Sequence, residues 1–501
     1  MINKVRKIII FGGGTSGWLT AAYMVKNLKI PAKITLIEDA SLGPIGVGEG
    51  TQPFTAQFLY ECGILPEMWM KDSEAGFKLG VELIGWNDTP YFVDNDSADN
   101  CVVAENLYTP GYFANKPHEV FNKWHPAYKL AKANKSLKIK DHLDLNFQMG
   151  QQGYGAVHFN AYKIIETIKK LIIDKIEYID TKITDIQKDV YGITKLIDHK
   201  ENIYQADLYL DCSGFQSLIV GKTLETPFQS YDQWLPNDRA VVIPTQFKNP
   251  EQECFPYTKA TTMNAGWMFT IPIFTRTGNG YVYSSKFISD EDAEKELRKK
   301  IGEFETPARF LKMRCGYQKE IAVKNACAVG LSAGFVEPLE ATGITFTTSV
   351  VKSITDLLNM FNNVWNDEIR KHLNRGFYEM SIEILTFVWS HYYFSNRNDT
   401  DYWKHIRNMK IENLPKDAQY VLSNFYPNPP GFLFFSPASM FNCVQWFSVL
   451  HAGGAYKNVD YSIDPKVEKY YDYFLDATNY KTERAKEIFP SHYEYLREWY
   501  S

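Results

Sequence analysis

The sequence predicts an α/β fold built on a parallel sheet, and the pattern of its N-terminal segment carries that prediction. Lys7–Phe11 is a β-branched run of the kind that is buried on both faces of a parallel sheet. A glycine-rich turn follows over residues 12–17, residues 18–28 have the apolar spacing of a helix, and Lys33–Glu38 is a second strand-like run. These pieces in this order predict a βαβ unit.

Later parts of the chain add strands and then helices. Strand-like patterns return in four segments, which are residues 176–190, 206–212, 240–290 and 325–334. The charged pattern of residues 176–190 predicts antiparallel strands, whereas residues 325–334 form a strand that leads into a glycine turn. A helix is predicted to begin near Thr342, and the pattern beyond it is mainly helical.

Composition excludes several classes of function. The 501 residues carry a net charge of −5 with a pI of about 6.1, so no basic surface indicates nucleic acid or an anionic membrane. The longest apolar runs are strand-sized, and no signal peptide precedes the first strand, so we expect a cytoplasmic protein that does not span a membrane. The seven cysteines are scattered without a CxxC pair, which predicts neither a disulfide framework nor a metal site.

The glycine turn predicts a dinucleotide site. Gly12, Gly14 and Gly17 have the GxGxxG spacing between a strand and a helix, and Glu38 ends the next strand. The first glycine permits the tight turn, the second lets the backbone approach a pyrophosphate, and the third lets helix and strand pack closely. The helix N-terminus supplies N–H donors to the phosphates, and Glu38 would accept hydrogen bonds from the ribose hydroxyls.

Two later glycine passages favour FAD over NAD. Residues 206–214 form a buried strand that runs into a Ser-Gly turn, and residues 325–334 repeat that arrangement late in the chain. Because a flavin is long, backbone from remote segments must close around its far parts. The predicted fold class is therefore α/β, an FAD-binding Rossmann-like module of the flavoprotein monooxygenase type, with an interleaved substrate sheet and a mainly helical C-terminal region.

The expected domain organisation follows from these elements. An FAD-binding α/β module is expected over residues 1–350, with interleaved substrate-covering segments at about residues 60–170 and 220–320. A mainly helical region over residues 351–501 is expected to cover the substrate site.

Several motifs together resemble the flavin-dependent halogenases grouped with tryptophan halogenases. The resemblance runs from Ile8 to about Trp446. Its motifs are GGGTSGW (residues 12–18), GVGEGT (46–51), DCSGF (211–215), GWMFTIP (266–272), GNGYVYSS (278–285), GFVEPLEATGI (334–344) and HYYFSNRNDTDYW (391–403).

The resemblance implies a reaction. Enzymes of this family take reduced FAD from a separate flavin reductase and use oxygen and a halide ion to form hypohalous acid. The acid passes to a lysine beside the substrate, where an electron-rich, indole-type aromatic ring is halogenated.

The resemblance also assigns residues. It implies Lys78 as the catalytic lysine, Glu340 as its partner carboxylate, and the amides of Thr342 and Gly343 as the halide site. Trp267 belongs to a WxWxIP-like signature that guards against ordinary monooxygenation. The implied flavin contacts, in addition to Gly14 and Gly17 of the glycine turn, are Gly12, Thr15, Ser16, Glu38, Ile45, Gly50, Ile183, Leu331 and Ile344.

The residue types suit these roles chemically. A lysine amine can hydrogen-bond hypohalous acid or form a haloamine, and either polarises the halogen. Glu340 can take the ring proton or stabilise the positive charge that grows on the ring. Free amides at the start of a helix favour an anion.

Three positions bear on the substrate. Phe269 replaces the second tryptophan of the signature, and Ala341 stands where tryptophan-specific members usually have serine. Trp446 is the candidate for a substrate wall. These departures favour an indole, a phenol or another small arene over free tryptophan.

Two alternatives stay open at the level of the sequence. An FAD-dependent aromatic monooxygenase would transfer oxygen directly and work without halide, although Gly330-Leu331 differs from the late Gly-Asp of such hydroxylases. A flavin-binding protein with a decayed active site is the other alternative, which the presence of both Lys78 and Glu340 opposes. The sequence also leaves a homodimer open.

Overall fold

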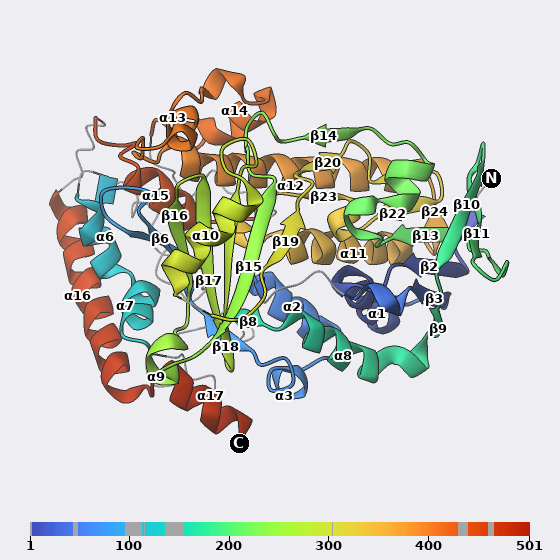
Figure 1. Ribbon diagram of the computed structural model, residues 1–501, viewed down its shortest axis with the longest axis horizontal. Helices are drawn as coiled ribbons and strands as arrows, with labels where there is room; N and C mark the ends of the chain where they lie inside the picture. The colour runs from blue at the N-terminus through green and yellow to red at the C-terminus, as the bar shows by residue number, and fades with distance from the viewer. Residues whose placement is uncertain are drawn as a thin grey trace. The chain divides into compact units, whose positions relative to one another are not determined.

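The chain forms two compact units, each assembled from three separate segments (Figure 1). The computed structural model describes residues 3–43, 49–95, 113–114, 116–135, 155–302, 304–428, 439–458 and 465–501. Unit 1 consists of Met1–Glu74, Phe159–Gln233 and Met313–Ser381. Unit 2 consists of Ala75–His158, Trp234–Lys312 and Ile382–Ser501.

The centre of unit 1 is a six-stranded sheet in the order β21-β22-β13-β2-β3-β9. Its strands are β2 (Lys7–Phe11), β3 (Lys33–Glu38), β9 (Glu177–Asp180), β13 (Leu208–Asp211), β21 (Ala322–Val323) and β22 (Ala326–Ala328). All neighbours pair in parallel except β21 and β22, and Ile8 lies opposite both Leu208 and Ile34. The first strand therefore lies between later ones, which is the doubly wound order of a Rossmann-like sheet. The predicted fold class is confirmed.

Hydrophobic burial explains why these residues form a central sheet. The side chains of Ile8, Ile10 and Leu36 are fully buried, as expected for strands that are covered on both faces. Helix α1 (Thr15–Asn27) packs against α8 (Ala161–Ile172) and α11 (Gly343–Met360) (Figure 1). Helix α1 begins three residues before the position predicted from its apolar spacing, because the turn of the helix starts directly after Gly14.

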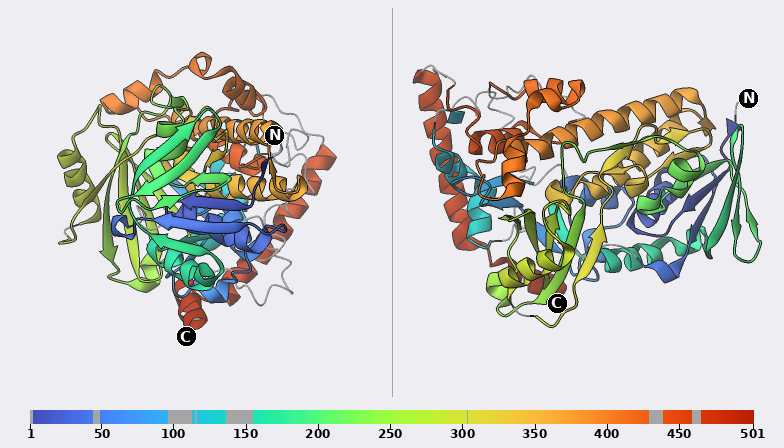
Figure 2. Two further views of the ribbon diagram at one scale, coloured as in Figure 1. Left: turned by 90° about the vertical axis from the view of Figure 1, so that its right-hand side faces the viewer. Right: turned by 45° about the horizontal axis from the view of Figure 1, so that its top comes forward.

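The segment at residues 176–190 differs from its prediction. Its first part is β9, which extends the parallel sheet and pairs with β3, so the antiparallel prediction is wrong there. Its second part is β10 (Ile183–Asp189), which does pair antiparallel with β11 (Gly192–Asp198). This hairpin extends away from the parallel sheet of unit 1 (Figure 2). The last bond of the parallel pairing runs from the Thr181 amide to the Glu38 carbonyl, and β10 begins two residues later.

Unit 2 is built on a seven-stranded sheet in the order β19-β15-β18-β17-β16-β6-β7. Neighbours are antiparallel except β16 and β6, which pair in parallel. The strands are β6 (Gly80–Ile84), β7 (Tyr91–Asp94), β15 (Arg239–Gln246), β16 (Thr258–Met263), β17 (Gly266–Ile273), β18 (Arg276–Tyr283) and β19 (Arg309–Lys312).

Helices of unit 2 cover this sheet. Helix α10 (Asp290–Ile301) packs Ala293 and Leu297 against Val241 and Tyr281 of the sheet. It begins at Ser289, whose hydroxyl accepts the Asp292 amide, and carries acidic residues in its first turn and basic residues in its last. Both features stabilise the helix ends.

The described C-terminal part of the chain is mainly helical, as predicted. Its helices are α12 (Asp367–Tyr393), α13 (Asp401–Arg407), α14 (Lys416–Ser423), α15 (Cys443–Ala452), α16 (Pro465–Ile488) and α17 (His492–Tyr500). The border between the two units falls within α12. None of the helices in the described residues has the length and hydropathy needed to span a membrane.

The remaining elements are short. In unit 1 they are β1 (Asn3–Lys4), β4 (Glu49–Gly50), α2 (Pro53–Glu61), α3 (Pro66–Trp69), β12 (Ile203–Tyr204), β14 (Phe228–Ser230), β20 (Gly316–Gln318), β23 (Gly334–Phe335) and β24 (Val364–Trp365). In unit 2 they are β5 (Gly76–Lys78), α6 (His118–Trp124), α7 (Pro126–Lys132), β8 (Ala156–Phe159, whose last residue falls in unit 1) and α9 (Pro250–Glu253).

We predict that Asp211→Ala destabilises unit 1. The buried Asp211 carboxylate accepts hydrogen bonds from Ser213, Ile219, Val220 and Ser332, so its removal leaves several buried donors unsatisfied. The expected loss in the free energy of unfolding is about 3 kcal/mol, measured by urea denaturation followed by circular dichroism. The exposed Asp232→Ala is the control, and an unchanged denaturation midpoint in Asp211→Ala would contradict the prediction.

Candidate active site

The residues predicted for the site divide between the two units. The glycine turn, Glu38, Leu331 and the segment around Glu340 belong to unit 1, whereas Lys78, the signature strand and Trp446 belong to unit 2.

The glycine turn of unit 1 is shaped by the absence of side chains. Gly12 has a φ of +114°, and a Cβ there would lie 2.3 Å from the Cys212 carbonyl oxygen. A Cβ on Gly17 would lie 1.8 Å from the Gly12 carbonyl oxygen, so only glycine lets helix α1 start this close to β2. A Cβ on Gly14 would instead meet nothing within 4 Å. The backbone at Gly14 therefore faces space that the described residues leave open.

The N-terminus of α1 has the features of an anion site. Gly14 is its N-cap residue, no side chain caps it, and its first turn holds no acidic residue. The first N–H groups of a helix have no acceptor within the helix, and the helix dipole places partial positive charge on them. The turn can hold a pyrophosphate by backbone N–H groups alone.

Glu38 is anchored by residues that the sequence did not single out. Its Oε1 accepts a hydrogen bond from the Tyr178 hydroxyl at 2.6 Å. The same oxygen forms an ion pair with the Lys169 ammonium at 3.2 Å. Burial lowers the pKa of the Lys169 ammonium, but its bonds to Tyr178 and Glu38 outweigh that effect and raise the pKa. The lysine therefore stays charged and holds the carboxylate beside the turn, where Oε2 would lie 1.6 Å from a Cβ on Gly13.

The late glycine passage and helix α11 both meet the first turn of α1. The Ser16 hydroxyl forms a hydrogen bond with the Thr347 hydroxyl of α11 at 2.8 Å. Gly330 has a φ of +65°, and a Cβ there would clash with the Ser16 side chain. Leu331 follows Gly330 in a short 3-10 helix, and Ser332 donates to Asp211 at the end of β13. The late segment that the sequence assigned to a flavin thus lies against the glycine turn within unit 1.

The segment around Glu340 is a tight turn in front of helix α11. Residues Pro338–Glu340 form a 3-10 turn, Ala341 takes a left-handed φ of +53°, and Thr342 is the N-cap of α11. A left-handed residue other than glycine stores backbone strain and persists only where its surroundings demand it. Gln52 helps to hold this turn, because its side-chain amide donates a hydrogen bond to the Glu340 carbonyl at 2.7 Å.

Burial at this turn is complete. The side chains of Glu340 and Thr342 are both 0% exposed. The Thr342 hydroxyl has no hydrogen-bond partner in the part of the chain that the structure describes. A Cβ on Gly343 would meet only the Phe335 ring, at an ordinary 3.5 Å, so protein packing alone does not require glycine there. Ile344 is buried in the first turn of α11.

Unit 1 fits the predicted FAD by these observations. The turn at Gly14 opens onto unfilled space, an uncapped helix N-terminus faces it, and the Glu38 carboxylate is held beside it. Gly50 lies in β4, two residues before the Gln52 that bonds the Glu340 turn. Ile183 begins β10 just beyond the edge strand β9, and Ile45 lies outside the described residues.

In unit 2, Lys78 is a buried residue on a short strand. It is the last residue of β5, which pairs antiparallel with β8 so that Lys78 lies opposite Ala156. Its side chain is 2% exposed, which is rare for a lysine without a specific role. The charge of Lys78 also acts on His158. Burial lowers the pKa of His158 well below its usual value, and the nearby charge of Lys78 lowers it further.

The signature strand of unit 2 presents its two aromatic residues on one face. Trp267 and Phe269 are two residues apart on β17, both are buried, and their ring centroids are 6.2 Å apart. Phe269 lies opposite Gly280 of β18, where a Cβ would be 2.1 Å from the phenylalanine ring. Gly280 therefore makes room for the ring at position 269.

Trp446 lies in an aromatic cluster of unit 2. It is on α15, stacks on Phe425 at 4.3 Å and meets Phe387 edge-on at 4.8 Å. Its side chain is fully buried, and its indole nitrogen has no hydrogen-bond partner among the residues described. His391 bonds the Tyr91 hydroxyl in the same unit, as expected for a structural histidine.

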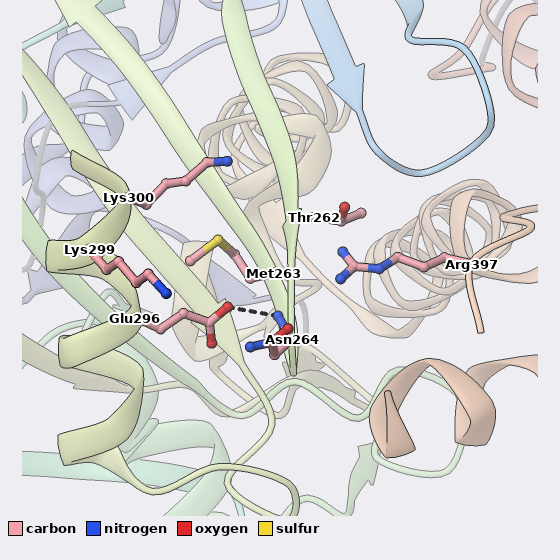
Figure 3. Close-up of a pocket in the computed structure, with 7 residues that line it drawn as sticks. All are labelled: Thr262, Met263, Asn264, Glu296, Lys299, Lys300 and Arg397. Atoms are coloured by element: carbon pink, nitrogen blue, oxygen red, sulfur yellow. Dashed lines mark hydrogen bonds between the residues drawn. The ribbon is translucent and has the colours of Figure 1, made fainter. Parts of the chain in front are cut away.

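A cavity of about 290 Å³ on unit 2 holds none of the predicted residues (Figure 3). It is lined by Thr262, Met263, Asn264, Glu296, Lys299, Lys300 and Arg397. The Glu296 carboxylate accepts the Asn264 amide there at 2.9 Å. No cluster in the described residues has the side chains to hold a metal ion.

Sequence reasoning missed the residues that support the site. Tyr178, Lys169 and Gln52 are far in sequence from the groups they bind, and no motif contains them. The strand order of the sheet is the only signal that could have placed Tyr178 beside Glu38, since β9 follows β3 at the edge.

Comparisons with known proteins agree with this architecture. The tryptophan halogenase family model matches residues 7–464. Tryptophan 6-halogenase ThaL of Streptomyces albogriseolus is 30% identical over 442 residues, which are 83% of this chain and 82% of that protein. The structure of a tryptophan halogenase from Shewanella frigidimarina matches with a TM-score of 0.88 at 25% identity, covering 99% of this chain and 98% of that one. A flavin-dependent halogenase from Xanthomonas campestris, Xcc4156, matches with a TM-score of 0.85 at 26% identity over the same shares.

The family settles the class of chemistry. Its members use FAD in its reduced form together with halide, need a separate flavin reductase, and act on small aromatic substrates. The hydroxylase alternative is not favoured. With a Rossmann-like sheet, a turn that fits FAD and a family match over nearly its whole length, the chain belongs to the tryptophan halogenase family and is a flavin-dependent halogenase.

Proposed function

We propose that this halogenase modifies an electron-rich, indole-type arene and that Lys78 and Glu340 are its catalytic residues. The observation that carries the proposal is the burial of both side chains, an amine at 2% and a carboxylate at 0% exposure, at the two motif positions where the reaction needs them. Buried ionisable groups are costly to desolvate, and catalytic sites are one place where proteins keep them.

The flavin site of the proposal lies in unit 1. Gly12, Gly14, Thr15, Ser16 and Gly17 would hold the pyrophosphate, and Glu38 would bind the ribose hydroxyls. Gly50, Leu331 and Ile344 would contact the remainder of the cofactor, and Ile45 and Ile183 complete the proposed set. Bound FAD, once reduced, supplies with oxygen the oxidising power that converts halide into hypohalous acid.

The halide site is proposed at the start of α11. Thr342 is the N-cap and Gly343 the first residue of α11, so their amides lie at a helix N-terminus, which favours an anion. The buried Thr342 hydroxyl, which has no partner in the described residues, supports a further donor to that anion. The left-handed Ala341 lies between the Glu340 turn and this helix start, and its φ of +53° is the kind of strained backbone that is found at binding sites.

The two catalytic side chains divide one substitution between them. Overall, a ring C–H and hypohalous acid give a ring carbon–halogen bond and water. Lys78 hydrogen-bonds the acid, polarises the halogen toward the ring and protonates the departing oxygen. Glu340 stabilises the positive charge on the ring and accepts the ring proton. A water molecule then relays that proton from Glu340 to the Lys78 amine, which restores both side chains.

The substrate assignment draws on the relatives and on the departures of this chain. Relatives of the chain include a tryptophan 6-halogenase and a tryptophan 7-halogenase. Trp446, buried between Phe425 and Phe387, supports an aromatic wall. Ala341 and Phe269 favour an indole or phenol without the amino-acid part of tryptophan.

The location and assembly stay predictions. The described cysteines, Cys62, Cys212, Cys254, Cys315, Cys327 and Cys443, are free thiols, which supports a reducing compartment such as the cytoplasm.

We predict that Lys78→Met abolishes halogenation. The assay combines the enzyme with a flavin reductase, oxygen, and an indole and phenol panel that includes tryptophan, and compares chloride, bromide and iodide by mass spectrometry. Halogenated product should fall by about 100-fold or more, whereas FAD affinity stays unchanged because the flavin residues lie in unit 1.

The exposed Lys71→Met is the matched control and should keep full activity. Full halogenation by Lys78→Met would contradict the assignment of Lys78 as the catalytic lysine. Hydroxylated product without a halide requirement would overturn the proposed chemistry as a whole.

We predict that Glu340→Gln lowers kcat about 10- to 100-fold with little change in KM. Glutamine keeps the buried shape but cannot accept the ring proton. Steady-state kinetics with the best substrate of the panel measure both constants, and the exposed Glu320→Gln is the control. A variant that loses substrate affinity while kcat is kept would assign Glu340 to binding instead.

We predict that Gly13→Ala weakens FAD binding. A Cβ there would lie 1.6 Å from Glu38 Oε2 and 2.5 Å from Glu38 Cβ, so the carboxylate must leave its place. Loss of its bonds to the ribose should raise the FAD dissociation constant about tenfold, measured by quenching of flavin fluorescence. Gly376→Ala, where a Cβ meets nothing within 4 Å, should bind FAD normally, and equal affinities in the two variants would contradict the prediction.

A further inference from the structure

Helix α17 is joined to the strand that carries Lys78. The Phe77 amide donates to His492 Nε2 at 3.0 Å, and the Tyr500 hydroxyl donates to the Ala75 carbonyl at 2.6 Å. These two bonds bracket Gly76, so α17 makes polar contacts with both peptide groups that flank it. All of these residues belong to unit 2.

Side-chain packing adds to the two bonds. The Phe77 ring stacks on Tyr495 at 5.8 Å and meets Trp499 edge-on at 6.5 Å. A Cβ on Gly76 would lie 3.2 Å from His492 Cε1, so the glycine allows the helix its close approach. Strand β5 is only three residues long, and a short strand depends on such neighbours for its position.

The bonds of His492 define its protonation state. A backbone amide can only donate, so Nε2 must be the acceptor from Phe77. A carbonyl can only accept, so Nδ1 must carry the proton that bonds the Cys254 carbonyl at 3.0 Å. His492 is therefore a neutral imidazole with its proton on Nδ1.

His158 lies on the strand that pairs with β5, and its hydrogen bonds could survive protonation of the imidazole. It lies opposite Gly76 on β8, its Nδ1 bonds the Pro272 carbonyl at 3.0 Å, and its Nε2 bonds the Thr258 hydroxyl at 2.8 Å. If His158 gained a proton, the Thr258 hydroxyl could turn and accept. The Phe77 amide cannot turn, so protonation of His492 must break its bond to β5.

We propose that His492 and Tyr500 are positioning residues for Lys78, which hold the backbone of β5 so that the lysine amine stays at its place of reaction. The inference rests on the proposed catalytic role of Lys78. Neither residue touches the reacting atoms in this proposal; both act through the peptide groups that precede the lysine.

Burial supports the neutral state of His492. It lowers the pKa of His492 from 6.5 to about 4. The groups that face this imidazole are the Cys254 thiol, whose Sγ lies 3.9 Å from Nδ1, and His158, which in turn senses the charge of Lys78. Because the unfolded chain binds the proton more readily, the stabilisation is complete above pH 6.5 and is lost as the pH falls toward 4.

The experiment compares variants of the full-length protein. His492→Gln keeps an acceptor for Phe77 and a donor for Cys254 without a titrating group, His492→Phe removes both bonds, and Tyr500→Phe removes one hydroxyl. The exposed His405→Gln and the half-buried Tyr493→Phe on α17 make the same changes away from β5. Two readouts are taken, hydrogen exchange of the peptide that contains Gly76–Lys78, and kcat and KM of halogenation between pH 5 and 8.

The expected results separate the variants. In His492→Phe, exchange of the β5 peptide rises and kcat falls by up to about 100-fold while FAD affinity is kept. Tyr500→Phe shows the same changes to a smaller degree. His492→Gln keeps kcat within about threefold at every pH from 5 to 8, because burial keeps the wild-type imidazole neutral over that range. The two controls match the wild type.

Two results would overturn the inference. One is unchanged exchange of the β5 peptide in His492→Phe, and the other is raised exchange with an unchanged kcat. Failure of the proposed function looks different, since Lys78→Met would then stay active while the exchange result still reports whether α17 holds the strand.

Discussion

The Asp211 carboxylate is the interaction on which the flavin-binding unit depends most. It ends the strand that pairs with β2, and it accepts hydrogen bonds from the turn that follows, from the π-helical turn Leu218–Thr223 and from Ser332. Three backbone segments that approach the carboxyl ends of the parallel strands are thus bound to one side chain. A buried carboxylate is stable only when hydrogen-bond donors surround it. The turns are therefore arranged so that their N–H and O–H groups reach the Asp211 oxygens.

In unit 2, buried polar groups near Lys78 also have hydrogen-bond partners, but these groups are uncharged. His492 and His158 each donate from Nδ1 to a carbonyl and accept at Nε2. Burial keeps both imidazoles neutral, so no additional charge is buried near the Lys78 ammonium. The strand of the lysine is therefore held by polar contacts that do not compete with the lysine electrostatically.

Local patterns in the sequence were enough for the central features of unit 1. The isoleucine run, the glycine spacing and the strand that ends at Glu38 predicted β2, the start of α1 and β3, because each depends on residues that are neighbours in the chain. The late glycine passage at Leu331 was also predictable, since glycine favours the left-handed turn at Gly330 and leaves room for Ser16.

Contacts between remote segments could not be predicted in this way. Tyr178 and Lys169 anchor Glu38 from more than a hundred residues away, and His492 reaches Phe77 from the far end of the chain. Residues 176–190 were predicted as antiparallel strands because the charged alternation of β9 resembles that of β10; the parallel partner of β9 lies elsewhere in the sequence. The roles of Lys78 and Glu340 came from the family motifs alone, and the structure adds the burial of both side chains.

The interleaving of the two units has a consequence for recombination between relatives. Each unit is assembled from three segments, so a chimera made by one crossover anywhere between residues 75 and 381 joins mismatched pieces in at least one core. Exchange of an intact unit requires crossovers at every border at once, the last of them inside the long helix α12. Diversity in this architecture is therefore expected to accumulate by point substitution and loop change, more readily than by shuffling of domains.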